Sequence, residues 1–64
     1  MIVTGDFVMF AAGHEWVAER YNYTINKAYE VKSTSDFYNT AKIVNDKGEE
    51  MSFQKERLLK VYVQ

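Results

Sequence analysis

Among the side chains that could do chemistry, His14 and Glu15 are adjacent and match the first two positions of the His-Glu-x-x-His zinc motif. That motif needs a second histidine one helical turn later to hold the metal, but the fifth position here is Ala18. The chain has one histidine and no cysteine, which leaves too few nitrogen and sulfur ligands for a zinc site. We therefore expect no metal and no cofactor, and we expect His14 to be a solvated loop residue.

A second candidate is the run Asn-Asp-Lys-Gly-Glu-Glu at residues 45–50, which has the composition of a calcium loop. Aligning Gly48 with the sixth position of such a loop puts Ile43 at the first position, where a carboxylate is required. The serines have no general base near them in sequence, and no glycine-rich phosphate loop is present. The sequence predicts a protein that is not an enzyme.

The same run of polar residues has a structural explanation, because it lies between two alternating segments in residues 41–53. Ala41 and Ile43 alternate with polar or outward residues on the way in, and Met51 and Phe53 do so on the way out, which is the period of a half-buried strand. The Asn and Asp side chains can close a turn, and Gly48 can adopt positive φ. We predict a β-hairpin with a loop of three to five residues.

Further strands are predicted from short apolar or alternating runs at residues 6–11, at residues 28–32 and at residues 59–63. In the second of these we expect Tyr29 and Val31 to point inward. In the last, the inward residues should be Leu59, Val61 and Val63.

The connections between these strands differ in how clearly they can be read. We interpret residues 33–36 as a polar turn and residues 54–58 as one tight helical turn. Residues 13–27 have two open interpretations, namely two helical turns at residues 14–21 or a long loop that folds back onto the core.

The bulk properties indicate a small folded domain. Sixty-four residues make a single domain, residues 1–64, and the net charge is −1 with both signs spread along the chain. The first six residues do not resemble a signal peptide, and no apolar run approaches the ~20 residues needed to span a bilayer. We expect a cytoplasmic protein that does not bind membranes.

The predicted order is strand, long loop, strand, short loop, strand, tight turn, strand, helical turn and strand. This order resembles the Src-homology-three-like small β-barrel, an all-β, five-stranded, partly open barrel. The resemblance is carried by Gly-Asp-Phe-Val at residues 5–8, Tyr-Glu-Val at 29–31, residues 43–49 and Arg-Leu-Leu-Lys-Val at 57–61. The stretch Ile-Val-Asn-Asp-Lys-Gly at residues 43–48 is similar to hairpins of small barrel proteins encoded by bacteriophages.

The resemblance implies a non-enzymatic accessory protein in the cytoplasm of an infected bacterium, binding host or phage components. The motifs by which related barrels bind proline-rich peptides, such as Ala-Leu-Tyr-Asp-Tyr, are missing from this sequence. Polyproline recognition is therefore not expected.

The residues expected to contact a protein partner are aromatic, because rings supply rigid contact area. We expect a groove between the long loop at residues 12–25 and the loop at residues 33–37. For Trp16 the sequence favours a place in the core, since so small a core needs its largest side chain, whereas for Tyr23 and Tyr38 core and surface are equally supported. The candidate partner-binding residues are Trp16, Tyr21, Tyr23, Phe37 and Tyr38.

An alternative function is nucleic-acid binding through a basic face in the C-terminal half, although acidic residues are interleaved there. The residues that would form it are Lys42, Lys55, Arg57 and Lys60. A further hypothesis is homodimerisation, or strand addition to a partner, through the open edge of a terminal strand, because no proline guards it.

Overall fold

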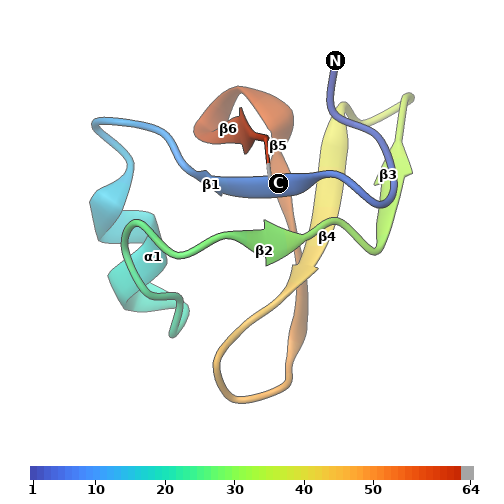
Figure 1. Ribbon diagram of the computed structural model, residues 1–64. Helices are drawn as coiled ribbons and strands as arrows, with labels where there is room; N and C mark the ends of the chain where they lie inside the picture. Colours follow the sequence, from blue (N-terminus) through green and yellow to red (C-terminus); the bar gives the residue numbers. More distant parts are fainter. Residues whose placement is uncertain (63–64) are drawn as a thin grey trace.

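The computed structural model describes residues 1–62, which form six strands, one short α-helix and one 3-10 turn (Figure 1). In chain order the elements are β1 (Phe7–Phe10), α1 (Glu15–Arg20), β2 (Tyr29–Glu30), β3 (Ser33–Ser35), β4 (Thr40–Val44), β5 (Glu50–Gln54), the 3-10 turn Lys55–Arg57 and β6 (Leu58–Val61).

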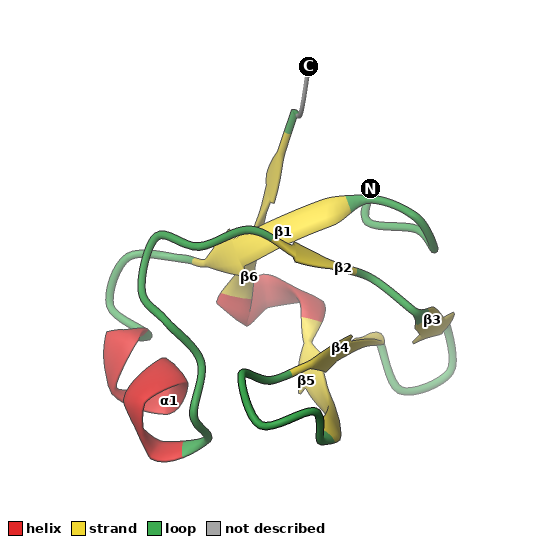
Figure 2. Ribbon diagram, turned by 60° about the horizontal axis from the view of Figure 1, so that its bottom comes forward, coloured by secondary structure: helices red, strands yellow, loops and turns green. Residues whose placement is uncertain are grey.

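The strands form two antiparallel three-stranded sheets, one in the order β2-β1-β6 and the other in the order β3-β4-β5. Figure 2 shows β1 and β2 lying across one side of the molecule and the hairpin β4–β5 on the other, with α1 at one end. The all-β class is confirmed. The described strands number six rather than the expected five, and they do not join into a closed barrel.

The predicted hairpin is confirmed. β4 pairs with β5 in the register Thr40↔Gln54 to Val44↔Glu50, with a five-residue loop at residues 45–49 between them. Gly48 has a φ of 84°, a conformation in which a side chain would be strained.

Residues 13–27 contain both of the features that the sequence left open. α1 makes the helical turns, and it buries Val17 and Ala18 against the core. The chain then folds back as a loop, in which Asn22 and Asn26 adopt positive φ, a conformation that asparagine tolerates. Trp16, on the same short helix, is 58% exposed, so the predicted core placement is wrong.

The position of the predicted polar turn is corrected. Residues 33–35 are not a turn but the edge strand β3, which pairs with β4 in the register Ser33↔Lys42 to Ser35↔Thr40. The turn follows at residues 36–39. A short polar sequence can serve as a strand here because an edge strand is exposed to water.

The last strand is shifted in phase from the prediction. β6 pairs with β1 in the register Phe10↔Leu58, and Leu58 is buried while Leu59 is 54% exposed. The 3-10 turn ends at Arg57, and this sets which residue first points inward. Val61 is partly buried, and Val63 lies outside the described residues.

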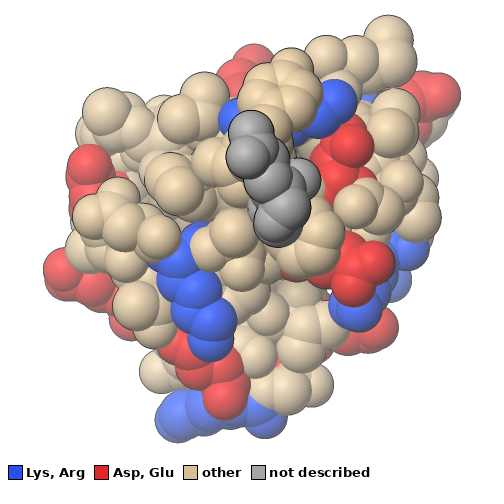
Figure 3. Space-filling view, viewed as in Figure 1, with Lys and Arg blue, Asp and Glu red and all other residues tan. Residues whose placement is uncertain are grey.

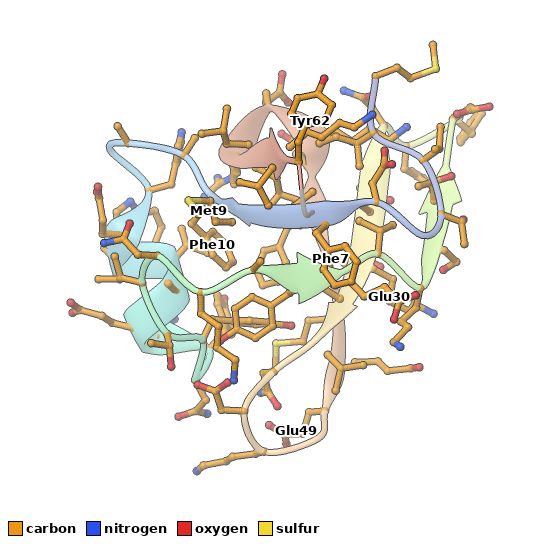
Figure 4. All side chains as sticks on the ribbon, in the orientation of Figure 1. Phe7, Met9, Phe10, Glu30, Glu49 and Tyr62 are labelled. Atoms are coloured by element: carbon orange, nitrogen blue, oxygen red, sulfur yellow. The ribbon has the colours of Figure 1, made fainter. Side chains whose placement is uncertain are left out.

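The core lies between the two sheets and α1, and aromatic rings fill its centre. Phe10, the last residue of β1 (Figure 4), makes edge contacts with the rings of Tyr23 and Phe53, at centroid distances of 5.3 and 5.2 Å. Tyr29 and Val31 are buried as predicted. The buried hydrophobic residues are Ile2, Val8, Phe10, Val17, Ala18, Tyr23, Tyr29, Val31, Ala41, Ile43, Phe53 and Leu58.

Candidate functional site

An open groove of about 600 Å³ lies between α1 and the free side of β5. The apolar side chains that line it include the buried Val17 and Phe53 and the partly buried Met51. Trp16 is also part of the lining, and the Arg57 guanidinium lies 5.7 Å from the centre of its ring. Tyr21 and two polar residues of β5, Ser52 and Gln54, complete the lining.

The chemistry of this groove suits an apolar side chain offered by another molecule. Trp16 and Tyr21 supply large, stiff ring surfaces, and Tyr21 is held by an edge contact with Phe53 at 5.8 Å. The cation of Arg57 lies over the indole ring, which restricts the ring without burying it. The groove thus presents a pre-ordered aromatic surface with two positive charges beside it, Arg57 over Trp16 and Arg20 over Tyr21 at 5.9 Å.

A second exposed ring pair lies on the turn at residues 36–39. Phe37 is 88% exposed and Tyr38 is 69% exposed, and their rings contact each other edge to face at 4.8 Å. Tyr38 borders a shallow hollow over the outer face of the sheet β3-β4-β5. This hollow shares Ser52 and Gln54 with the groove, so the two depressions adjoin across β5.

The structure brings together most, but not all, of the predicted partner-binding residues. Of the five residues, Trp16 and Tyr21 share the groove and Phe37 and Tyr38 share the turn beyond it. Tyr23 does not belong to this surface: it is 4% exposed and packed in the core. We refer to Trp16, Tyr21, Phe37 and Tyr38 as the aromatic surface.

One expectation about the groove is corrected. Residues 12–25 do form one wall, because α1 belongs to that segment, but the other wall is β5 and not residues 33–37, since residues 33–35 form a strand that pairs with β4. The contributions of Met51 and Arg57 were missed by sequence reasoning, although the alternation in the hairpin already placed Met51 beside Phe53 on one face. Nothing in the sequence signals the stacking of Arg57 on Trp16.

The loop of the hairpin holds the segment that follows α1. Asp46 accepts hydrogen bonds from Thr24 Oγ1, from Lys27 Nζ at 3.0 Å and from the Tyr29 hydroxyl at 2.8 Å. These hydrogen bonds lower the pKa of Asp46 to about 2, with that from Thr24 having the largest effect. The buried Asn45 donates to the backbone oxygen of Tyr21 at 2.9 Å. The hairpin loop therefore fixes the position of Tyr21 at the end of α1.

The four basic residues proposed for nucleic-acid binding are spread over three places, and two of them share one place. Lys42 borders the hollow on the outer face of the sheet, and Arg57 lies on Trp16. Lys55 and Lys60 border a third hollow, where Lys55 Nζ lies 3.7 Å from Asp36, and Lys60 Nζ lies 3.4 Å from Asp6. Figure 3 shows acidic groups interspersed with the basic groups on one face of the molecule.

His14 precedes α1 and is only partly exposed. Its Nδ1 atom is buried and has no hydrogen-bond partner within residues 1–62, so it is not the fully solvated residue that we expected. In this part of the chain no three His, Cys, Asp or Glu side chains gather where they could hold a metal ion. No helix there has both the length and the apolar character needed to cross a membrane.

Comparison with models of known protein families, with curated proteins and with solved structures found no match to this chain.

Proposed function

We propose that this chain is a small, non-enzymatic protein-binding module that recognises a protein partner through the aromatic surface. The observation that carries the proposal is the exposure of Trp16 beside an open apolar groove. A domain of 64 residues has little apolar material for its core, and leaving its one tryptophan 58% exposed reduces what the core can bury. Exposed tryptophan and tyrosine are the residue types that most often dominate binding energy at interfaces.

The anchoring of α1 supports the same proposal. Trp16 lies on a helix whose Val17 and Ala18 are packed into the core, and Tyr21 follows that helix directly, where Asn45 holds its backbone oxygen. Rings that are ordered before binding lose little conformational entropy when a partner arrives. A hot-spot ring of this kind typically contributes about 2 kcal/mol or more when truncated to alanine.

The proposal also includes the type of fold and the biological setting of the protein. We infer a Src-homology-three-like barrel type from the order of the strands and from the 3-10 turn before the last strand. A bacteriophage accessory role, with a bacterial host protein as partner and the host cytoplasm as location, rests on the Ile-Val-Asn-Asp-Lys-Gly hairpin at residues 43–48. The alternative of nucleic-acid binding through Lys42, Lys55, Arg57 and Lys60 stays a prediction that the same experiment tests.

The experiment is an affinity capture of the tagged protein from bacterial lysate, with and without nuclease, followed by mass spectrometry. The wild type is compared with Trp16→Ala and with the matched control Tyr62→Ala. Tyr62 is an exposed ring near β6 that lies outside the groove between α1 and β5 (Figure 4). Circular dichroism verifies that each variant is folded.

A protein partner that survives nuclease, is lost with Trp16→Ala and is retained with Tyr62→Ala would support the proposal. Capture that disappears with nuclease would replace it with the nucleic-acid alternative, since phosphate contacts would then dominate affinity. A protein partner retained equally by both variants would refute the assignment of the aromatic surface.

A further inference from the structure

β5 is the edge strand of its sheet, and half of its backbone groups point away from the protein. The register of the hairpin shows which residues of β5 bond to β4. Two hydrogen bonds at its ends fix the phase, Asn45 N–H to Glu49 O and Lys55 N–H to Asn39 O. By alternation those residues of β5 are Met51 and Phe53.

The backbone N–H and C=O groups of Glu50, Ser52 and Gln54 therefore face the open edge. No hydrogen bond found within residues 1–62 uses these N–H and C=O groups. Their side chains are exposed on the outer face of the sheet, and the space beyond the edge is the open groove between β5 and α1. β5 carries no proline and no lysine, the residues that most often protect an edge strand from pairing.

We propose that β5 pairs antiparallel with β5 of a second copy of this chain, about a two-fold axis that passes beside Ser52. In this register Ser52 faces Ser52 of the partner, and Glu50 faces Gln54 of the partner. Each of the three facing pairs exchanges two backbone hydrogen bonds, so every free group on the edge is used. On the other face of the sheet, Met51 of one copy lies opposite Phe53 of the other, which places apolar groups together.

The number of facing pairs and the charges select this register over its neighbours. Axes at Met51 or Phe53 would align only two facing pairs of outward residues instead of three. An axis at Glu50 would bring two carboxylates face to face, and an axis at Gln54 would require pairing beyond the strand, into the 3-10 turn. The Ser52-centred register uses the whole strand and places no like charges opposite each other.

The same reasoning disfavours the last strand, which the sequence suggested as the pairing edge. β6 is also an edge strand, and the hydrogen bond from Ala11 N–H to Arg57 O shows by alternation that Leu58 and Lys60 face its open side. A two-fold axis at Leu59 would align only two facing pairs, Leu58 with Lys60 of the partner, and an axis at Lys60 would place Lys60 opposite Lys60 of the partner. Like charges in directly opposed positions destabilise a strand pair.

The dimer goes beyond the proposed binding function, and because Ser52 and Gln54 also line the groove, a second copy and a protein partner compete for this side of β5. The test of the dimer needs no other protein. Sedimentation equilibrium of the purified full chain, from about 10 µM to about 1 mM, should show a monomer of 7.5 kDa in reversible exchange with a dimer. We expect a Kd on the order of 0.1 mM, because one five-residue strand pair buries less area than a standard interface.

Two proline variants test which edge pairs. Ser52→Pro removes an N–H that faces the open side of β5 without touching the hairpin bonds, and it should leave a folded monomer at every concentration tested. Lys60→Pro does the same to the β6 edge and should leave the dimer intact. Ser52→Ala, which keeps the N–H, is the second control.

A charge pair tests the register without relying on proline. Gln54→Lys would face Glu50 of the partner at two symmetric positions and should tighten the dimer by about 2-fold to 30-fold, whereas Gln54→Glu should weaken it by a similar factor. Ser33→Lys and Ser33→Glu change the net charge equally on the opposite edge strand and should have much smaller effects. A wild-type mass that stays monomeric at every concentration would overturn the proposal. A dimer whose Kd is unchanged by both Ser52→Pro and the substitutions at Gln54 would overturn it as well.

Discussion

The stability of the hairpin loop should depend on the side chain of one buried polar residue, Asn45, which is 5% exposed. Its amide donates to the backbone oxygen of Tyr21 and to the carboxylate of Glu49, both at 2.9 Å. Its oxygen accepts from the N–H groups of Lys47 at 2.9 Å and of Glu49 at 2.8 Å. All four hydrogen-bonding positions of the amide are filled, and Asn45→Ala removes every one.

The expected loss follows from these contacts. A net contribution of about 0.5–1.5 kcal/mol for each hydrogen bond gives about 2–6 kcal/mol for the four. The lower half of that range applies, because the groups of Lys47 and Glu49 lie on an exposed loop and regain water. We therefore expect Asn45→Ala to lower the free energy of unfolding by about 2–4 kcal/mol. A domain of this size has only about 3–5 kcal/mol in total.

Urea denaturation followed by circular dichroism measures this difference. Lys47→Ala is the matched control, since it changes an exposed side chain of the same loop and should shift the free energy of unfolding by no more than about 0.5 kcal/mol. An Asn45→Ala variant within about 0.5 kcal/mol of the wild type would refute the conclusion that this side chain holds the loop and the end of α1.

Three further predictions concern the core, the loop carboxylate and the exposed ring. Tyr23→Phe removes the hydrogen bond that the hydroxyl donates to the backbone oxygen of Ile43 at 2.8 Å. Because that oxygen still accepts from Met51 in the hairpin, the loss should be about 0.5–1.5 kcal/mol in thermal or urea unfolding. Because the pKa of Asp46 falls from 3.8 to about 2 on folding, its contribution is present above pH 4 and is lost as the pH drops from about 4 to about 2. The stability difference between the wild type and Asp46→Asn, measured by urea unfolding, should therefore shrink over that range. A constant difference would count against the assigned hydrogen bonds. Trp16→Ala should destabilise by less than about 1 kcal/mol, whereas Phe53→Ala should lose about 3–5 kcal/mol, and equal losses would show that Trp16 belongs to the core.

The elements that the sequence predicts well are those in which one short pattern determines the result. Alternation in residues 41–53 and the glycine at position 48 were sufficient to define the hairpin and its loop. The last strand failed because Leu58, Leu59 and Val61 put apolar residues in both phases of the alternation. Only the pairing of Leu58 with Phe10 decides between the two phases.

The site was harder to predict because its parts depend on contacts between distant segments. Tyr23 enters the core because its hydroxyl finds a partner in Ile43, twenty positions away. Trp16 stays outside because the six-residue helix buries one narrow face, and Val17 and Ala18 already fill it. Periodicity alone could not reveal that Arg57 lies over Trp16.

The claim that Trp16 belongs to a binding surface is tested most directly by acrylamide quenching of its fluorescence, since it is the only tryptophan in the chain. The measurement uses the wild type at a concentration far below the Kd of the dimer, and then the same protein with the captured partner added. The account predicts strong quenching in the free folded protein, as expected for a side chain 58% exposed, and clear protection when the partner binds. A Trp16 that is already shielded in the free protein, or that stays equally accessible in the complex, would contradict it.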